Sequence, residues 1–265
     1  MNTHQEAGGN AARTVIVTGA SRGIGRASAI RLARDFGTVV IAARSAGGLE
    51  EAAQAINAAG AVAHPVAIDL RLPDAGQTLV DAAFAKTGRI DAIANIAGQV
   101  PQSDLMDMTD AEWDDGLSMK LHGARRIALA GWPHLKASGG SLLFMSGATA
   151  VAPKAALAGV SAINAAILAM AKAFAERGLV DGIQVNSVQP GAVMTSRRLG
   201  VIERYAEREG LTTQDAILAY ARELGIARYG EPEDIAELVA FLLSPRARWI
   251  TGSTMRIDGG EARSI

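Results

Sequence analysis

Short apolar runs rich in β-branched residues alternate along this chain with longer, Ala-rich stretches of helical periodicity. The apolar runs are Thr14–Thr18, Thr38–Ala42, Ala61–Ile68, Ala92–Asn95, Ser141–Met145, Gln184–Val188 and Thr254–Ile257. The helical stretches cover about Gly23–Asp35, Leu49–Ala59, Gly76–Thr87, Asp110–Ala130 and Ser161–Arg177. Strands that alternate with helices are typical of repeated βαβ units. The pattern therefore predicts an α/β fold with a seven-stranded parallel sheet, doubly wound and flanked by helices.

The chain predicts one domain, because neither an internal repeat nor a Pro- or Ser-rich linker divides it. Residues 1–12 are polar, and we expect a disordered tail before a single domain over 13–265. An irregular insertion at about 192–230 separates the sixth apolar run from the last helix. Long insertions beside a rigid sheet are usually functional, so we interpret this one as a lid over the site. The alternative is a surface elaboration that only aids assembly.

Composition excludes several classes of protein. The 265 residues are 49% hydrophobic with a formal net charge of -1, which supplies a core and no positive field for nucleic acid. No run of about 18 uninterrupted apolar residues predicts a membrane span, and the polar start lacks a secretory signal, so we expect a cytoplasmic protein. The chain has no Cys, and its four His are scattered, so thiol chemistry is excluded and a metal site is not expected.

The helix predicted at Ser161–Arg177 is apolar almost all round. A helix of this kind must be covered on most sides, and a sheet covers only one. The pattern therefore predicts a contact between subunits through this helix, related by a two-fold axis.

The first predicted strand runs directly into a glycine-rich turn and then a helix. The turn, Thr18–Gly25, contains Gly19, Ser21, Arg22, Gly23, Ile24 and Gly25. Glycines let the backbone approach a pyrophosphate, and the following helix N-terminus offers N–H groups and a positive dipole end to it. This arrangement predicts a dinucleotide-binding Rossmann domain.

The end of the second predicted strand bears on the choice of dinucleotide. An acidic residue there would bind the ribose 2′-hydroxyl of NAD, but the chain reads Ala42-Ala43-Arg44-Ser45. Arg44 and Arg22 instead place guanidinium groups where the 2′-phosphate of NADP would lie. The sequence favours NADP(H), with NAD(H) possible if both arginines are solvated surface charges.

Taken together, these residues resemble the short-chain dehydrogenase/reductase family from Arg13 to Gly260. Further motifs of the family follow in order: Asp69-Leu70, Asn95–Gly98, Asn186–Gly191 with Thr195, Gly230–Ala236, and Ile250–Gly252 through Asp258–Gly260. The resemblance implies that Asp69 and Leu70 border the adenine and that Asn95, Ala97 and Gly98 line the adenosine side. It also implies that Pro190, Gly191, Val193 and Thr195 hold the nicotinamide carboxamide.

The catalytic end departs from that family, whose acid is a Tyr with a Lys four residues later, assisted by a Ser and an Asn. None of the three Tyr in this chain has a Lys four residues later. Alignment on the family pattern places Val160 at the Tyr position, Asn164 at the Lys position, Gly147 at the Ser position and Lys120 at the Asn position. All four positions of the family's catalytic set are therefore replaced.

Two of these replacements form an exchange, because Lys120 stands where Asn belongs and Asn164 stands where Lys belongs. We hypothesise that Lys120, partnered by Asn164, brings an amine of lowered pKa to the site as a proton donor or base. Alternatively, Lys120 extends its charge to solvent and only its stem packs.

Weaker candidates surround this pair. Ser146, at a strand end, could bind a substrate oxygen or merely cap backbone groups. His122 is expected to point away from Lys120, toward solvent or an interface. Nothing in the sequence selects Thr149 or Lys154.

Three functions remain open. The leading one is an NADP(H)-preferring oxidoreductase with an atypical catalytic site, acting on a small or medium carbonyl, alcohol or C=N substrate. The second is a catalytically silent NAD(P)-binding protein that serves as a partner subunit or redox sensor, and the third is non-redox chemistry on the same scaffold. The family resemblance implies a homotetramer.

Overall fold

The computed structural model describes residues 13–263, so the tail predicted at 1–12 lies outside the described residues. Seven parallel strands form one doubly wound sheet, as the sequence predicts, and the structure gives their order as β3-β2-β1-β4-β5-β6-β7. The strands are β1 (Thr14–Thr18), β2 (Thr38–Ala43), β3 (Val62–Ala67), β4 (Ala92–Asn95), β5 (Ser141–Met145), β6 (Gln184–Pro190) and β7 (Thr254–Ile257). Their bounds agree with the apolar runs to within two residues at each end.

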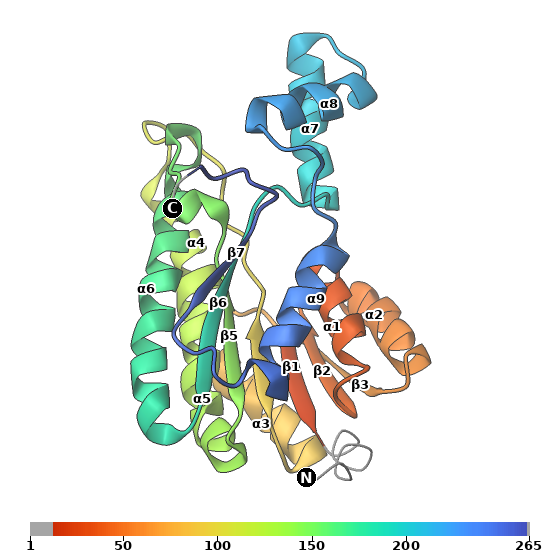
Figure 1. Cartoon of the computed structure of the whole chain (residues 1–265), viewed down its shortest axis with the longest axis vertical. Helices are drawn as coiled ribbons and strands as arrows, with labels where there is room; N and C mark the ends of the chain where they lie inside the picture. The colour runs from red at the N-terminus through yellow and green to blue at the C-terminus, as the bar shows by residue number, and fades with distance from the viewer. Residues whose placement is uncertain (1–12, 264–265) are drawn as a thin grey trace.

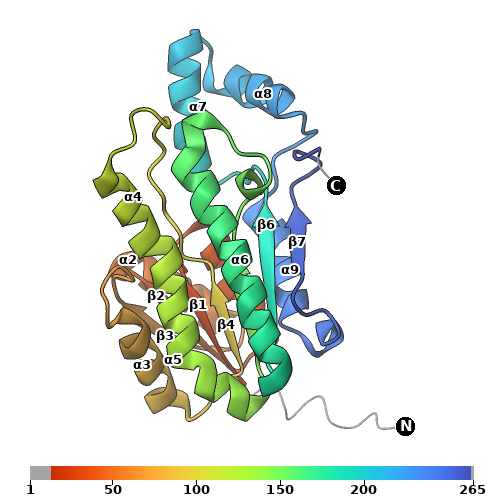
Figure 2. The ribbon, with the colours of Figure 1, turned by 90° about the vertical axis from the view of Figure 1, so that its left-hand side faces the viewer.

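Helices cover both faces of the sheet (Figures 1 and 2). One face carries α1 (Gly23–Leu32), α2 (Ala46–Ala58) and α9 (Pro232–Leu242). The other carries α3 (Ala75–Thr87), α5 (Gly123–Ser138) and α6 (Ala158–Asp181). α4 (Asp110–Gly116) runs into α5 through a π-helical turn, Leu117–His122.

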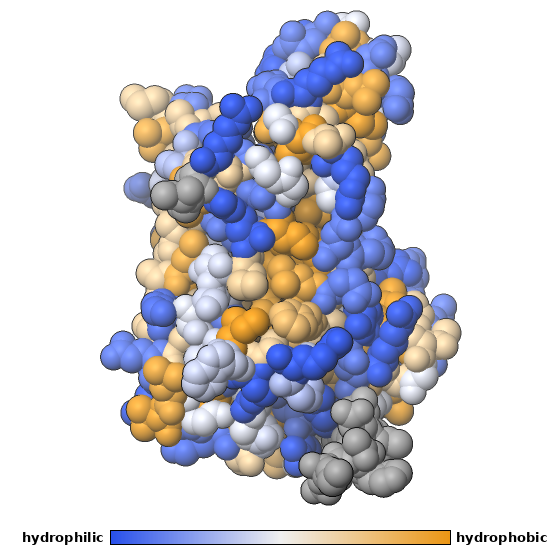
Figure 3. Space-filling view, viewed as in Figure 1, coloured by the Kyte–Doolittle hydropathy of each residue, from blue (hydrophilic) through white to orange (hydrophobic). Residues whose placement is uncertain are grey.

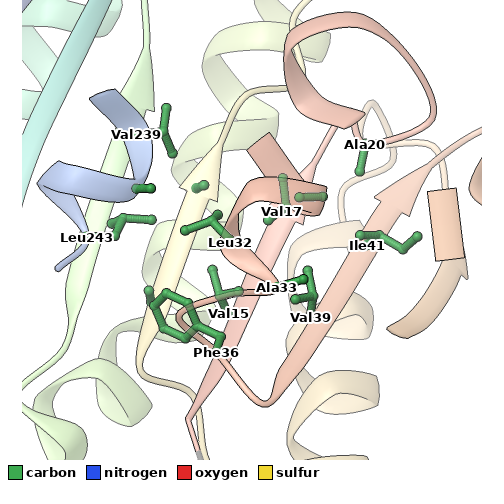
Figure 4. Close-up of a cluster of buried hydrophobic side chains, with 14 of the residues drawn as sticks. Val15, Val17, Ala20, Leu32, Ala33, Phe36, Val39, Ile41, Val239 and Leu243 are labelled. Atoms are coloured by element: carbon green, nitrogen blue, oxygen red, sulfur yellow. The ribbon is translucent and has the colours of Figure 1, made fainter. Parts of the chain in front are cut away.

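The middle positions of β1 and β5, Val15–Val17 and Leu142–Phe144, are all apolar because both faces of these strands are buried. Val15 and Val17 of β1 pack with Val39, Leu32 and Val239 on the side of α1 and α9, as Figure 4 shows. Ile16, between the two valines, points to the opposite face, into the cluster beneath α3, α5 and α6. Burial of these side chains stabilises the domain by about 1.5–3 kcal/mol each.

The site follows from the strand order. β1 pairs with β2 on one side and with β4 on the other, so the chain leaves the first strand in one direction and returns to build the second half in the other. At such a switch point the loops that follow the two strands diverge and leave a crevice at the carboxyl edge of the sheet.

The long helix that the sequence places at about Asp110–Ala130 extends further at its C-terminal end in the structure. The predicted end at Ala130 is therefore wrong. The helix continues through Pro133 to Ser138 and ends at Gly139. Pro133 lies on the exposed face of the helix, where water can satisfy the backbone carbonyl that loses its N–H donor.

The insertion after β6 carries two helices of its own, α7 (Ser196–Glu209) and α8 (Thr213–Leu224), which project beyond the sheet (Figure 1). A small apolar cluster holds them together, with Ile202, Ala216 and Tyr229 among its buried members. At the base, Val193 and Gly230 form an isolated parallel bridge, and Met194 N–H donates to the Gly230 carbonyl at 2.7 Å. The two ends of the insertion are therefore tied to each other.

One helical stretch among the described residues, Ala155–Asp181, has the length and apolar composition of a membrane span. It contains α6, whose Ile167, Ala171 and Ala175 are buried on one side against the sheet. The opposite side, with Ala162, Ala165 and Ala169, is exposed. We interpret α6 as a core helix whose outer face is unusually rich in Ala.

Candidate active site

The glycine-rich turn between β1 and α1 has no room for side chains at two positions. A Cβ on Gly19, whose φ is +71°, would lie 2.8 Å from the Ala97 Cα, and a Cβ on Gly25 would lie 2.2 Å from the Gly19 carbonyl oxygen. Both distances are shorter than any real Cβ contact. The turn therefore packs backbone on backbone, and the N-terminus of α1 remains open to a ligand.

A cavity of about 790 Å³ opens at the carboxyl edge of the sheet over this turn. Most of the residues that the sequence nominates line it. They are Gly19, Ser21, Arg22, Gly23, Ile24, Gly25, Arg44, Leu70, Ala97, Gly98, Lys120, Ser146, Gly147, Val160, Asn164, Pro190, Gly191, Val193 and Thr195. The volume is within the range of ligand sites in proteins.

Two nominated residues do not line the cavity. Asp69 lies beside it, where its Oδ1 accepts hydrogen bonds from the backbone N–H and the guanidinium of Arg71. Asn95 is buried in the core, and neither side-chain amide atom has a hydrogen-bond partner among the described residues.

The end of the cavity nearest β2 is basic. Arg22 precedes α1, Arg44 follows β2, and both side chains are exposed. Within residues 13–263 neither arginine has a carboxylate within 4.0 Å. Ser45 caps α2 by accepting from the Gly48 N–H, so a second helix N-terminus faces the same region.

Lys120 lies at the opposite end of the cavity, within the π-helical turn. Such turns often occur at functional sites, since the wider turn redirects a side chain that a regular helix would place elsewhere. The side chain is 8% exposed, and its stem passes Gly98, where a Cβ would lie 2.9 Å from the Lys120 Cδ. The amine therefore stays inside the protein instead of extending to solvent.

The amine of Lys120 has two hydrogen-bond acceptors, Asn164 Oδ1 at 2.5 Å and the Ser146 carbonyl at 3.2 Å. Neither acceptor carries a full charge. Burial, together with the positive charge of Arg197, lowers the pKa of Lys120 to about 7. The amine thus exchanges a proton near neutrality, as an acid–base catalyst must.

Asn164 is held in one orientation. Its Nδ2 donates to Thr149 Oγ1 at 2.9 Å, so its Oδ1 faces Lys120. Gly147 gives it room, since a Cβ there would lie 2.7 Å from the Asn164 Nδ2. Ser146 uses its hydroxyl to donate to the Asn164 backbone carbonyl at 2.9 Å, which is the backbone-capping alternative.

The remaining candidates lie outside the cavity. His122 does not line it, and the His122 Nδ1 is buried without a hydrogen-bond partner among the described residues. Lys154 is exposed and does not line the cavity. The three tyrosines, Tyr205, Tyr220 and Tyr229, pack in the cluster of the insertion instead of the cavity.

The sequence analysis missed Arg197 and did not select Thr149. Arg197, in the first turn of α7, lines the cavity, and its Nη2 donates to the Val100 carbonyl at 3.0 Å across the mouth of the site. A weak signal was present, because Arg197 and Arg198 follow Thr195, a residue of the predicted cofactor motif, by two and three positions.

The switch-point cavity, the glycine turn and the unpaired arginines define a Rossmann-type dinucleotide-binding protein. A family model described as enoyl-(acyl carrier protein) reductase matches residues 19–261. A short-chain reductase protein, NovJ, of Streptomyces niveus is 31% identical over 245 residues, 92% of each chain. The L-rhamnose 1-dehydrogenase (NAD(P)(+)) of Azotobacter vinelandii is 32% identical over 254 residues, 94% of this chain and 96% of that protein.

Solved structures agree with these matches. L-Sorbose reductase from Gluconobacter frateurii, in complex with NADPH and L-sorbose, superposes with a TM-score of 0.91 at 27% identity and covers 95% of this chain and 97% of that one. The chain belongs to the short-chain dehydrogenase/reductase family.

Proposed function

We propose that the protein is an NADP(H)-preferring oxidoreductase that transfers hydride to or from a small or medium carbonyl, alcohol or C=N compound. In this proposal Lys120 replaces the family's tyrosine as the proton donor, and Asn164 positions it. The observation that carries the proposal is a buried amine, held by Asn164 Oδ1 and the Ser146 carbonyl, on the wall of a cavity that the glycine turn also lines. Burial lowers its pKa to about 7, which suits a proton donor.

The residues present fit a phosphorylated dinucleotide. The turn at Gly19 and Gly25 is the cradle that a Cβ would fill, and Arg22 and Arg44 offer unpaired guanidinium groups to a 2′-phosphate. The similar structure of L-sorbose reductase is a complex with NADPH, which supports the same cofactor for this chain. When bound, NADPH would supply the hydride.

The chain itself would manage the proton. Protonated Lys120 donates to the carbonyl oxygen as negative charge develops on it, and the amine then recovers a proton from solvent. Asn164 Oδ1 and the Ser146 carbonyl hold the amine in place throughout, since both accept from it. The insertion over 192–230 acts as a lid that excludes water from the reacting atoms.

The pH dependence of turnover tests this proposal. Reduction requires the ammonium form, so kcat should be level below about pH 7 and fall about tenfold per pH unit above it, whereas oxidation should rise toward pH 7 and then level off. The measurement is steady-state kcat against pH, on substrates found by a screen of carbonyl and imine compounds with NADPH.

Asn164→Asp is the matched variant for this profile. A carboxylate 2.5 Å from the amine favours the ammonium, so the pH limb should move upward. If the pH at which kcat falls is the same in Asn164→Asp as in wild type, a group other than Lys120 controls the pH profile. Binding of NADPH without turnover of any compound would instead support a silent partner or sensor.

Arg44 should determine the preference for NADPH over NADH. Arg44→Ala removes a guanidinium–phosphate contact, and we expect the Kd of NADPH to rise about 10- to 100-fold while that of NADH stays within about twofold. Quenching of protein fluorescence by each nucleotide measures both constants without substrate. Arg125→Ala, on the exposed side of α5 away from the cavity, is the control, and equal effects on both nucleotides would contradict the assignment.

We also propose a homotetramer, because two apolar faces are unpartnered. One is the Ala-rich outer side of α6. The other follows β7 and α9, where hydrophobic residues gather down the middle of the face shown in Figure 3. Partly buried side chains from these elements and the turn before β7 include Leu238, Phe241, Ile250, Met255 and Ile257.

Light scattering should give about four times the chain mass of 27.4 kDa. Ala165→Glu, on the outer side of α6, should reduce the mass to that of a smaller assembly because it buries a charge in the contact. Ala85→Glu, on the exposed side of α3, should leave the mass unchanged. A wild-type monomer would exclude the tetramer.

A further inference from the structure

The charged residues that line the cavity are strongly unbalanced. Five are basic and one is acidic, and the basic ones are Arg22, Arg44, Lys120, Arg197 and Arg198. The acidic one, Glu261, already accepts a hydrogen bond from the Ala192 backbone N–H at 2.8 Å. Among residues 13–263 none of the five basic side chains has a carboxylate within 4.0 Å, although eight other arginines do. The site therefore keeps an excess of positive charge without an internal partner.

A dinucleotide accounts for part of this excess. Arg22 and Arg44 lie where a 2′-phosphate would bind, and the glycine turn with the N-terminus of α1 serves a pyrophosphate through backbone N–H groups. Lys120, Arg197 and Arg198 remain. The stem of Lys120 passes Gly98, and Arg197 donates to the Val100 carbonyl two residues further on, so these two cations lie against the same loop. The charge of Arg197 also helps to lower the pKa of Lys120.

Arg197 is placed to bind a ligand there. Its single hydrogen bond to the described residues, Nη2 to the Val100 carbonyl, fixes one edge of the guanidinium at the mouth of the site. The side chain is otherwise exposed to the cavity. A guanidinium has five N–H donors, and its fork matches the two oxygens of a carboxylate.

We propose that the substrate is a keto acid, or the corresponding hydroxy acid, whose carboxylate binds to Arg197 while its reacting oxygen faces Lys120. This inference rests on the proposed function and names the substrate class of that site. A neutral substrate would leave the charges of Arg197 and Lys120 without a counter-charge, whereas a carboxylate bound to Arg197 supplies one and offsets their repulsion. The carboxylate also favours the ammonium form of Lys120 that reduction requires.

The test compares acids with their own methyl esters. A panel of α- and β-keto acids of about three to eight carbons, and the methyl ester of each, is assayed with NADPH on wild type and on Arg197→Leu. We expect the wild type to prefer the acid, and the variant to raise the KM of the acid about 10- to 100-fold while the KM of the ester changes less than about threefold. Arg204→Leu, an exposed arginine on the same helix away from the cavity, should change neither value.

Binding provides a readout besides turnover. Titration calorimetry of the same keto acids into the NADP⁺-loaded protein, which cannot reduce them, should give heat with wild type and none with Arg197→Leu, and the Kd of NADPH should agree between the two proteins. A weaker Kd for NADPH with an unchanged KM for the acid would assign Arg197 to the cofactor and overturn the inference. Equal turnover of acids and esters would also overturn it, with the proposed function intact.

The two proposals fail in distinguishable ways. If acids bind in the calorimeter but no compound is turned over, the anion site stands and the oxidoreductase fails. If neither acids nor esters bind or react, the anion site is refuted as well.

Discussion

Replacement of Lys120 by Met should lower kcat for reduction by about 10² to 10⁴-fold, or about 3–5 kcal/mol, and leave the Kd of NADPH unchanged. Met nearly matches the length of the lysine stem that packs on Gly98, so the cavity should keep its shape. It has no proton to donate. Stopped-flow measurement of hydride transfer, beside a fluorescence titration of NADPH, separates the two effects.

The same variant should be more stable than the wild type. Burial lowers the pKa of Lys120 in the folded state from 10.5 to about 7, so the fold disfavours the ammonium. Below about pH 7 Lys120 is protonated in both the folded and the unfolded chain. The folded state then bears the full free-energy cost of burying the ammonium. Between pH 7 and 10.5 the unfolded chain binds more protons, so stability rises with pH in the wild type. We expect the gain from Met, roughly 1–3 kcal/mol, to be largest below about pH 7 and to shrink above it.

Lys154→Met is the control, because Lys154 is an exposed lysine outside the cavity. It should change neither the rate nor the melting temperature. Unchanged turnover in Lys120→Met would remove the acid role from Lys120. A melting temperature that falls at every pH would show that the amine contributes more through its hydrogen bonds than its burial costs.

Gly25→Ala should abolish binding of the dinucleotide while the sheet still forms. The new Cβ would lie 2.2 Å from the Gly19 carbonyl oxygen, and both atoms belong to backbone packed on backbone. The turn must open, which moves the N-terminus of α1 away from its ligand. We expect the Kd of NADPH to rise at least about 100-fold, or about 2.7 kcal/mol, with about 1–3 kcal/mol lost from stability.

Gly47→Ala supplies the comparison. Gly47 lies in the first turn of α2, and a Cβ there has no atom within 4 Å. This substitution should leave the Kd within about twofold and stabilise the helix slightly, since Ala is the better helix former. Circular dichroism at a fixed protein concentration checks that both variants retain the fold. A normal Kd in Gly25→Ala would exclude the turn as the phosphate cradle.

The parallel sheet could be predicted because its central strands are buried on both faces. Runs such as Val15–Val17 and Leu142–Phe144 are apolar at every position and are followed by helical periodicity, which is typical of a doubly wound parallel sheet. The end of α5 could not be predicted in the same way. Pro133 normally ends a helix, and its tolerance depends on which face of α5 remains exposed after folding.

The cofactor side of the cavity was accessible to sequence reasoning because each of its motifs directly follows a strand. The proposed acid–base pair is different, since Lys120 and Asn164 are 44 residues apart in the chain and belong to separate helical segments. Their contact was hypothesised from the exchange of residue types relative to the family pattern. The structure brings them together, and it adds Thr149 as the group that orients Asn164.

The sequence places Arg197 close to the motif residue Thr195 but does not show which way its side chain points. Its partner, the Val100 carbonyl, is 97 residues away on another loop. Every residue has a backbone carbonyl, so the residue type at position 100 does not reveal this contact. An arginine at the start of a polar helix normally lies in solvent. Only the fold of the insertion shows that this one faces the cavity.

The bridge between Val193 and Gly230 joins the two ends of the insertion, and the insertion has an apolar cluster of its own, separate from the clusters that pack on the sheet. Thr195 lies between these anchors and packs beside the glycine turn, since a Cβ on Gly23 would lie 3.3 Å from the Thr195 Cγ2. Residues of α7 and α8 beyond Thr195 can be gained or lost without altering the register of β6 and β7. Selection can therefore remodel the recognition of substrates through α7 and α8 while Thr195 keeps its place. Such modularity allows a single scaffold to diversify its chemistry by changing α7 and α8 alone.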